Sequence, residues 1–521
     1  MEGKDKLASK VLMACLFATG LSGIVAEYIL ATLAHHFLGN GVTQWVMILS
    51  FMLFSMGLGS RISRFIEGKE LEIFIGIEFL LSILVSFSSL FTYSIIGLGK
   101  YNWIAIYVLA VLIGLMIGME IPLVTRINGR YENLKANIAS VMEKDYYGSL
   151  IGGIFFVVVG LPYLGLTYTP FLLGVVNFLV AIVLLWVMRD RLRLPLLNVF
   201  FLAAFLIASF IGLGAVYAKP IVLWGEQNRY VDKVVFSKQT KYQKIVITKY
   251  KSNYWLYLNS GKQLSTFDEW LYHEPLVHPV MQLSENPKHV LIMGAGDGCA
   301  IREVLKYPDV DSVFLVDLDP MMTDIGANHA IFAELNDSAY HNEKVKVFNA
   351  DAYNWLEDSE RFFDVIICDF PDPKNPDLNR LYSKEFYSLC HKRLRPNGVI
   401  VTQASSPYYT TTAFRCIENT IRSSGFSTQP LHNHVYTFGE WGWVIGAKSI
   451  QQEQIKSILQ KKPLKDVPMR WLTQDGMSLI TSFGKDIVLE KVDSISVNSI
   501  HNPVLYQYYD KGNWSIYFNN Y

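Results

Sequence analysis

The sequence has no excess of charge of either sign and contains few cysteines. Its 521 residues include 46 Lys and Arg against 46 Asp and Glu, a formal net charge of zero. Because phosphate binding needs a concentrated basic surface, this balance argues against a nucleic acid partner. The cysteines lack the spacing of a metal site, and we expect free, mostly buried thiols. They are Cys15, Cys299, Cys368, Cys390 and Cys416.

Charged residues are scarce over the first 217 positions, where almost all of the apolar excess lies. A chain of this length normally forms more than one domain. A membrane-crossing helix needs about 20 apolar residues, and seven stretches meet that requirement. They are 11–34, 43–60, 73–97, 102–124, 147–166, 168–188 and 194–217. A cleaved signal peptide would not explain the six later stretches, so an α-helical multi-pass membrane bundle is predicted.

Lys and Arg gather in alternate loops of this region, which by the positive-inside rule marks those loops as internal. The loops carry Lys4, Lys6, Lys10; Arg61, Arg64, Lys69; Arg126, Arg130, Lys135, Lys144; and Arg189, Arg191, Arg193. The other loops hold only Lys100. The N-terminus is therefore expected inside, and seven crossings would leave the C-terminal part outside. That placement is avoided if one segment is re-entrant or if the count is wrong by one; otherwise the domain faces out. The stretch from Gly148 to Gly165, interrupted by Gly and Pro, is the candidate for the irregular segment.

Three carboxylates fall within the apolar stretches: Glu27, Glu78 and Glu120. An acid inside a membrane is costly and suggests a site, particularly for a cationic amine. Helix packing is the alternative, because Glu27 and Glu120 have small neighbours suited to close helix contact.

The second half of the chain has the pattern of a soluble α/β protein. Short alternating strands within 218–289 predict a small antiparallel β module with a turn near Asn259 to Gly261, followed by a connecting helix. Strands and helices then alternate over 290–449, which predicts a Rossmann-like, methyltransferase-like domain with a parallel sheet and helices on both faces. A C-terminal extension covers 450–521, and 1–217 forms the transmembrane domain.

Acidic residues follow three successive predicted strands of this domain. Gly294 and Gly296 flank a tight turn before Asp297, and the turn lets a ligand approach the backbone. Asp317 ends the next strand, 21 residues after Gly296, where an acid can hold ribose hydroxyls. Asp351 ends the third strand, where its carboxylate can meet the adenine edge. Together they predict an adenosine-containing ligand.

A fourth strand ends in Asp369-Phe370-Pro371-Asp372-Pro373, with Pro376 following. Two carboxylates three residues apart, stiffened by prolines, suit a cationic amine, although a simple turn cluster is the alternative. This loop resembles the DxxDPxxP loop of the spermidine synthase family, and further matching segments extend the resemblance over roughly 230–449. Those segments are Tyr242-Gln243, Gly261 to Gln263, Asp268-Glu269 through Tyr272-His273-Glu274, and Tyr436 to Trp441. The hydrophobic N-terminal half and the tail from Val497 to Trp514 resemble the membrane-fused branch of the family.

The resemblance implies which residues contact which substrate. The nucleoside side would comprise Gln243, Gly294, Gly296, Asp317, Asp351, Ala352 and Pro376. The amine side would comprise Tyr242, Gln263, His273, Asp297, Asp372, Tyr436 and Trp441, with Asp369 as the catalytic acid/base residue. Two positions depart from the family pattern: Asp317 stands where a Glu is usual, and Ala295 replaces a glycine.

The expected reaction is transfer of an aminopropyl group from decarboxylated S-adenosylmethionine to a diamine such as putrescine, giving spermidine and 5'-methylthioadenosine. No permanent cofactor or metal is expected, because the sulfonium is already a good leaving group. The expected partners are the small-molecule diamine and nucleoside substrates, the lipid bilayer and a second copy in a homodimer.

Two alternatives remain at this point. One is an S-adenosylmethionine-dependent methyltransferase, and the other is a polyamine transporter or sensor that uses the domain for binding. The substrate is cytosolic, so a cytoplasmic catalytic domain is expected, in conflict with the loop charges.

Overall fold

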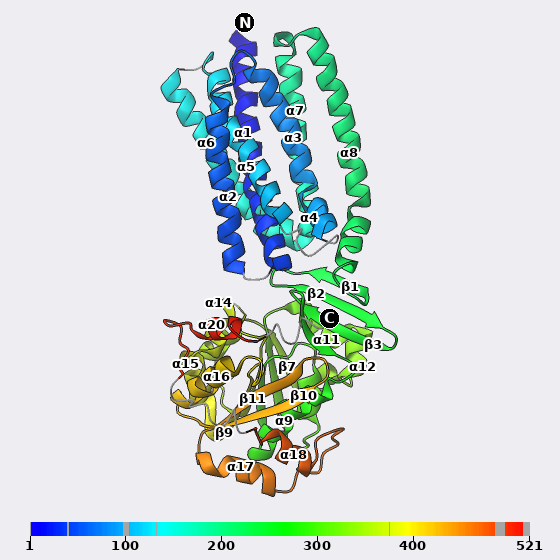
Figure 1. Cartoon of the computed structure of the whole chain (residues 1–521), viewed down its shortest axis with the longest axis vertical. Helices are drawn as coiled ribbons and strands as arrows, with labels where there is room; N and C mark the ends of the chain where they lie inside the picture. The colour runs from blue at the N-terminus through cyan, green and yellow to red at the C-terminus, as the bar shows by residue number, and fades with distance from the viewer. Residues whose placement is uncertain are drawn as a thin grey trace. The chain divides into compact units, whose positions relative to one another are not determined.

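The computed structural model describes residues 2–38, 41–96, 104–131, 133–374, 376–484 and 495–513. The chain forms two compact units: Met1–Tyr250 with Tyr257–Gly261, and Lys251–Leu256 with Lys262–Tyr521. Their elements are labelled in Figure 1. Lys100 of the loop-charge pattern and Trp514 of the tail motif lie outside the described residues.

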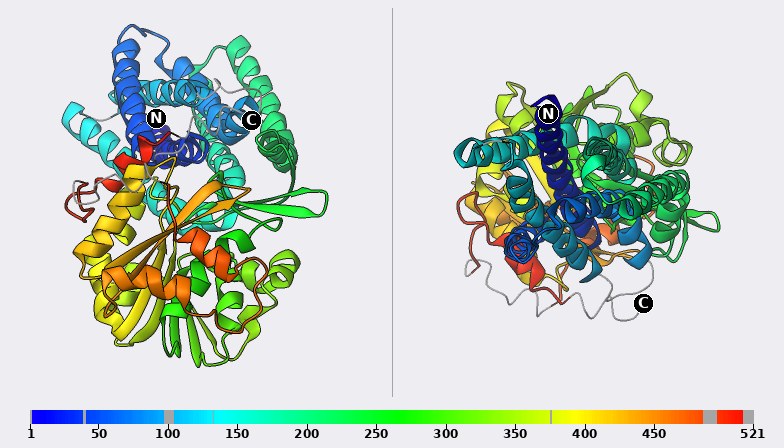
Figure 2. Two further views of the ribbon diagram at one scale, coloured as in Figure 1. Left: turned by 60° about the horizontal axis from the view of Figure 1, so that its bottom comes forward. Right: turned by 90° about the horizontal axis from the view of Figure 1, so that it is seen from above.

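The first unit consists mainly of long apolar helices. They are α1 (Glu2–Leu38), α2 (Gly41–Ser63), α3 (Glu70–Ser86), α4 (Ser88–Ile96), α5 (Ile104–Asn128), α6 (Leu134–Phe155), the π-helix η1 (Phe156–Leu164), α7 (Gly165–Met188), the 3-10 helix η2 (Arg189–Arg191) and α8 (Leu194–Gln227). Helix α1 contacts α2, α5, α6 and α7 and lies inside the bundle, as the view from above in Figure 2 shows. The most apolar stretch of α1 is 72% buried against 11% for α8. The core of this unit therefore forms around α1.

By length and composition, five described helices could cross a membrane, or six if the pair α3 and α4, bent by 51°, forms one span. One of the five is the stretch Leu134–Arg191, but this stretch reverses direction. The Thr169 hydroxyl donates to the Gly160 carbonyl at 2.9 Å, whereas nine residues of continuous helix would separate them by about 13 Å. Gly165, at φ +64°, stands between them. The stretch therefore contains two helical segments, and over the described residues each of the seven apolar stretches corresponds to a separate helix or helix pair.

Cationic side chains join several connections at one end of this bundle. The Arg126 guanidinium, near the end of α5, donates to the carbonyls of Ile66 and Ser63 at 2.8 and 2.6 Å. The Arg191 guanidinium lies 5.0 Å from the centre of the Tyr131 ring. The α2–α3, α5–α6 and α7–α8 connections therefore share one end. Because α8 starts there and is 34 residues long, about 50 Å of helix, it finishes at the opposite end.

The segment predicted to be irregular contains the π-helix η1 with Pro162, which precedes the reversal at Gly165. Four strands follow the bundle: β1 (Lys233–Gln239), β2 (Lys244–Tyr250), β3 (Asn253–Leu258) and β4 (Gly261–Ser265). They form a sheet in the order β1-β2-β3-β4. The predicted turn near 259 has positive φ at Asn259 and Ser260.

The second unit contains a seven-stranded sheet in the order β10-β11-β9-β8-β5-β6-β7. Its strands are β5 (His289–Gly294), β6 (Ser312–Asp317), β7 (Val345–Asn349), β8 (Phe363–Asp369), β9 (Leu394–Gln403), β10 (Ser427–Val435) and β11 (Gly439–Ala447). Strands β5 to β9 are parallel. The expectation of a wholly parallel sheet was wrong, because β10 and β11 form an antiparallel hairpin. Strand β10 was not predicted, since its sequence STQPLHNHV lacks a clear apolar run.

Helices cover both faces of this sheet. They are α9 (Trp270–Leu283), α10 (Cys299–Leu305), α11 (Pro320–Asn328), α12 (Ala330–Leu335), η3 (Ala339–His341), α13 (Ala352–Asp358), α14 (Pro376–Asn379), η4 (Arg380–Tyr382), α15 (Lys384–Arg393), α16 (Thr411–Ser423), α17 (Gln452–Lys461), α18 (Gln474–Ile480) and α20 (Leu505–Asp510). Alternate residues of β5 enter two separate cores. Val290 and Ile292 pack with α9 and α17, whereas Leu291 and Met293 pack with α13, α15 and α16. A strand buried on both faces explains why its sequence is continuously apolar.

The order of the strands sets the place for ligands. Strand β5 pairs with β6 on one side and with β8 on the other, so the chain winds outward in both directions from β5. In open α/β sheets, ligands bind beyond the carboxyl ends of the strands at such a point. Gly294 and Asp369, the last residues of β5 and β8, are register partners there.

Candidate active site

The loop between β5 and α10 depends on glycine. Gly294 and Gly298 have φ of +80° and +85°, and Ala295 adopts +59°. A Cβ at Gly294 would lie 2.1 Å from the Asp369 carbonyl oxygen, so only glycine lets the two strand ends approach this closely. The Tyr340 hydroxyl donates to the Gly296 carbonyl at 2.7 Å, which holds the loop from outside.

Asp317, at the end of β6, lies against this loop. A Cβ at Gly296 would come within 2.8 Å of the Asp317 Oδ2. Burial, together with the charges of Asp319 and Asp297, raises the pKa of Asp317 to about 6. The structure thus brings the predicted glycine loop and the predicted ribose acid together.

Asp351 and Ala352 lie at the start of α13. The Asp351 carboxylate caps this helix by accepting from the Asn354 N–H at 3.0 Å, and it also contacts the Arg380 guanidinium. Ala352 is buried, and Pro376 begins α14. Asp351 therefore has a structural task in addition to its predicted contact with a nucleoside.

Asp369, the predicted catalytic acid, is partly buried at the end of β8. Its Oδ1 accepts a hydrogen bond from the Tyr272 hydroxyl at 2.5 Å. Burial raises the pKa of Asp369 to about 6; the Asp297 charge also raises it, whereas the His273 charge and the Tyr272 hydrogen bond lower it. The carboxyl can therefore exchange a proton near neutral pH.

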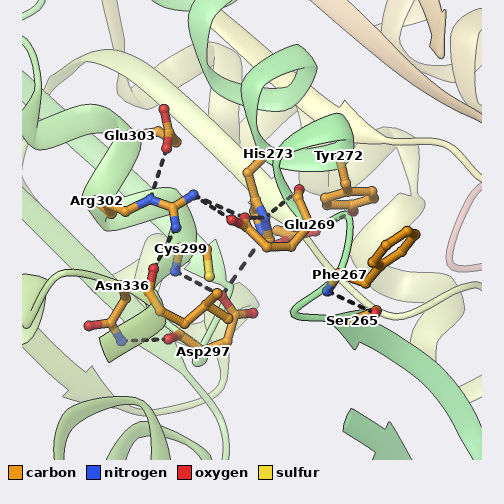
Figure 3. Close-up of polar contacts among 12 residues, drawn as sticks. Ser265, Phe267, Glu269, Tyr272, His273, Asp297, Cys299, Arg302, Glu303 and Asn336 are labelled. Carbon is orange, nitrogen blue, oxygen red and sulfur yellow. Dashed lines mark hydrogen bonds and ion pairs between the residues drawn. The ribbon is translucent and has the colours of Figure 1, made fainter. Parts of the chain in front are cut away.

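His273 lies at the centre of a network of charges, drawn in Figure 3. Its Nδ1 lies 2.7 Å from a Glu269 carboxylate oxygen and its Nε2 lies 3.8 Å from Asp297 Oδ1. The Arg302 guanidinium donates hydrogen bonds to both carboxylate oxygens of Glu269, at 3.0 and 2.9 Å. Burial lowers the pKa of His273, but Glu269, Asp297 and Asp369 outweigh it and raise the pKa to about 9. At neutral pH the imidazole is protonated and faces two carboxylates.

A metal was not expected, yet one atom each of His273, Asp297 and Asp369 lies within 4.8 Å of the others. Such a set could hold a cation. The same carboxylates can accept hydrogen bonds from charged organic groups.

Asp372 lies on the loop after β8 and contacts the C-terminal region. Its Oδ2 accepts from the Tyr509 hydroxyl of α20 at 2.9 Å, and its Oδ1 is buried without a hydrogen bond. Burial raises the pKa of Asp372, whereas Lys374 and hydrogen bonding by Tyr509, Gln403 and Ser405 oppose that shift. The Oδ1 is the oxygen that could accept from a further donor.

The turn between β10 and β11 is fixed by Asp268. The Asp268 carboxylate accepts from the Thr437 N–H at 2.6 Å and from its hydroxyl at 2.7 Å. Beside this anchor, Tyr436 is 62% exposed, while Trp441 is buried and its indole N–H has no hydrogen-bond partner in the part of the chain that the structure describes. The hairpin therefore presents one exposed and one buried aromatic residue from the predicted motif.

Three predicted residues lie on the four-stranded sheet. Gln263 is on β4, within the second unit, and Tyr242 and Gln243 form the β1–β2 turn of the first unit. Their substrate contacts stay predictions.

Other residues of the network had no assigned role in the prediction. Tyr272 and Glu269 fall within a matching motif but were not assigned as site residues. The spacing of Glu269 four residues before His273 was a usable signal, because residues i and i+4 lie on one face of a helix. Arg302 and Tyr509 gave no such signal, because their contacts with Glu269 and Asp372 span 33 and 137 residues. Such contacts depend on the tertiary fold.

The fold and these side chains define a class: an α/β enzyme that binds its ligands beyond the carboxyl ends of β5, β6 and β8 and presents carboxylates to them. A family model described as "Spermine/spermidine synthase domain" matches residues 269–461.

Full-length relatives carry the same identification. Polyamine aminopropyltransferase 2 of Aquifex aeolicus is 39% identical over 96% of this chain and 99% of its own. Polyamine aminopropyltransferase of Leptospira interrogans is 37% identical over 94% and 96%. The solved spermidine synthase of Thermotoga maritima is 24% identical, with a TM-score of 0.44, over 49% of this chain and 86% of that chain. The chain belongs to the polyamine aminopropyltransferase family and is an aminopropyl-transferring enzyme. The alignments also include the helical first unit.

Proposed function

We propose that the enzyme transfers an aminopropyl group from decarboxylated S-adenosylmethionine to a diamine such as putrescine, giving spermidine and 5'-methylthioadenosine. The observation that carries this proposal is the position of Asp369, a carboxyl with a pKa of about 6. It lies at the carboxyl end of β8 beside β5, where the chain winds outward in both directions. It is hydrogen-bonded by Tyr272 and lies beside His273 and Asp297.

The nucleoside would lie over the glycine loop. Asp317, against Gly296, would accept hydrogen bonds from the ribose hydroxyls, and Asp351 and Ala352 would meet the adenine. The shorter Asp in place of the family's Glu is accommodated by the close approach of the loop, because Gly296 leaves no Cβ between Asp317 and the ligand.

The amine would lie between Asp369, Asp297 and Asp372. A diamine is mostly protonated at neutral pH, so the attacking end must lose a proton, and ionised Asp369 accepts it. The neutral nitrogen then attacks the aminopropyl carbon bound to sulfur. A C–N bond forms as the C–S bond breaks, and the electron pair of that bond neutralises the sulfonium as methylthioadenosine leaves. The other ammonium end stays bound to Asp372.

Protonated His273 has a positioning task in this scheme. It faces both Asp297 and Asp369, and Glu269 and Arg302 fix its ring. This arrangement keeps the reacting carboxyl aimed at the amine, and fixed geometry supplies much of the rate of a displacement.

A direct assay tests the proposed function. Detergent-purified protein is incubated with decarboxylated S-adenosylmethionine and a panel of diamines, and methylthioadenosine is measured. Asp369→Asn should remove product formation while Asp377→Asn, an exposed acid on α14, should not. If the wild-type protein forms no methylthioadenosine with any diamine of the panel, the proposal is overturned. Methyl transfer from S-adenosylmethionine, measured on the same preparation, would then support the methyltransferase alternative.

The apolar helices support a further part of the proposal: the first unit resides in a lipid bilayer. The residues of several helices that face outward are apolar, including Phe54, Leu202 and Phe205, which are 65, 60 and 69% exposed. Exposure of large apolar side chains along whole helices is costly in water and favourable in lipid.

A further inference from the structure

Two carboxylates with no hydrogen bond lie in the core of the helical unit. Glu78 on α3 is 0% exposed and Glu120 on α5 is 1% exposed. Within the described residues, no hydrogen bond of ordinary geometry reaches any of their four oxygens. The Thr19 hydroxyl is the hydrogen-bonding group beside both, and the charged groups that act on them there include no Lys or Arg.

A third polar group points to the same place. Thr19 on α1 is 1% exposed, and its hydroxyl lies close enough to both carboxylates to hydrogen-bond with either. Within the described residues it has no hydrogen bond of ordinary geometry to another group. Helices α1, α3 and α5 contact one another. Cys15, one turn before Thr19, interacts electrostatically with both carboxylates. Helices α1, α3 and α5 therefore place one hydroxyl and two carboxylates close together in the core of the bundle.

Structural packing is a poor explanation for this pair. Two carboxylates in a medium of low polarity repel each other and lose their hydration, and apolar side chains of similar size would usually stabilise a core better. The pair can persist only with a bound proton or another cation. A carboxylate pair and a hydroxyl together offer acceptors that suit the three N–H donors of an alkylammonium.

Further polar side chains lie against α1 beyond Thr19. Asp145 on α6 acts on Glu120, and a Cβ at Gly20 would lie 3.0 Å from its Oδ1. The Ser22 hydroxyl donates to Asn177 Oδ1 at 2.9 Å, and Asn177 Nδ2 has no hydrogen-bond partner among the described residues. Glu27 follows, about 12 Å along the helix from Thr19. Polar side chains thus occur beside α1 from Thr19 to Glu27.

We propose that Glu78 and Glu120 form an exchangeable cation site, which holds a proton and releases it for the ammonium group of a di- or polyamine that the bundle carries across the membrane. One ammonium group enters as one proton leaves, so the net charge of the site is unchanged by the exchange. The choice of amine rests on the proposed enzymatic function, whereas the need for a cation rests on the pair itself.

Uptake by vesicles tests this proposal. Full-length protein is reconstituted in vesicles of phosphatidylethanolamine and phosphatidylglycerol with an acidic interior, and entry of radiolabelled putrescine is measured against protein-free vesicles. Glu78→Gln and Glu120→Gln should each slow uptake about tenfold or more, the loss expected for a hydrogen bond to a charged group. Glu143→Gln, an exposed acid on α6, should leave uptake unchanged.

Aminopropyl transfer, measured on the same preparations, separates this proposal from the enzymatic one. Transfer should continue in both glutamine variants, which shows that the protein is folded. Uptake no faster than in protein-free vesicles, or equal uptake by the variants and the wild type, would overturn the cation site. A joint loss of uptake, transfer and thermal stability would assign the pair to helix packing and would also overturn it.

Discussion

Asp369 and Asp372 are three residues apart but have different neighbours. Asp369 faces Tyr272, His273 and Asp297, whereas Asp372 contacts Tyr509 and keeps one buried oxygen free. Asp369→Asn keeps the shape and removes the proton acceptor. We expect turnover to fall on the order of 10²–10⁴-fold, the usual contribution of general acid-base catalysis. Methylthioadenosine affinity and the thermal midpoint should be preserved, and a variant with near wild-type turnover would exclude Asp369 as the base.

Asp372→Asn should act on binding instead of chemistry. Removing the charge that holds the distal ammonium should raise the diamine KM about tenfold, with a much smaller change in kcat, the pattern of lost ground-state binding. Tyr509→Phe, which removes the hydroxyl that orients Asp372, should change KM in the same direction by less. Equal losses of kcat and stability in both variants would show that the loop is only structural.

Tyr272 should set the acid side of the pH profile. Catalysis needs ionised Asp369, whose pKa lies near 6, so kcat/KM should fall as pH drops through about 6. The Tyr272 hydrogen bond lowers the pKa of Asp369, and Tyr272→Phe should therefore move this limb to higher pH. Profiles of both proteins with the same diamine cancel the titration of the substrate. A limb that stays in place or moves to lower pH would contradict this assignment.

The β5–α10 loop shows how a connecting element determines the site. Gly294→Ala would force a Cβ into a left-handed conformation, which costs about 1–2 kcal/mol, and against the Asp369 carbonyl. We expect a lower thermal midpoint and weaker methylthioadenosine binding. Gly476→Ala in α18 is a matched control, because its nearest neighbour would be 3.5 Å away. A Gly294→Ala protein as stable as the control would show that the strand ends can separate without cost.

Elements differ in how clearly the sequence predicts them. The central residues of strands β5, β6 and β8 are apolar because both faces are buried, and the carboxylates that end β6 and β8 were predicted in place. Strand β10 was missed because its buried residues include His432 and Asn433, whose polar groups have partners: His432 Nε2 lies 2.6 Å from the Ser482 carbonyl, and Asn433 donates to the Leu271 carbonyl. Those partners come from distant parts of the chain.

At the scale of the whole molecule, the helical unit and the enzymatic unit impose different demands on topology. The α2–α3, α5–α6 and α7–α8 connections are rich in Lys and Arg, and the positive-inside rule places such connections on the inner side. Helix α8 starts at that end of the bundle and finishes at the opposite end. The rule therefore predicts that the chain leaves the bundle on the outer side. The nucleoside substrate is cytosolic. We expect the substrate requirement to prevail, with the second unit in the cytosol and the cationic connections outside.

Reporter fusions decide between these arrangements. A C-terminal reporter active only in the cytosol should give signal, and one active only outside should not. The same reporters placed in the α5–α6 connection should give the reverse result. Signal from the outer reporter at the C-terminus would contradict this placement and would require an exported substrate.

The sequence by itself determined the two-part organisation, the apolar helices, the α/β fold of the second half and the acids at its strand ends. These features depend on local composition and periodicity, which the order of residues states directly. Only the tertiary structure decided the reversal at Gly165, the antiparallel hairpin β10–β11, the Arg302–Glu269–His273 network and the contact of Tyr509 with Asp372. It also decided that Glu78 and Glu120 meet at Thr19. Each of these depends on residues far apart in the chain, and packing of the whole fold sets their distance.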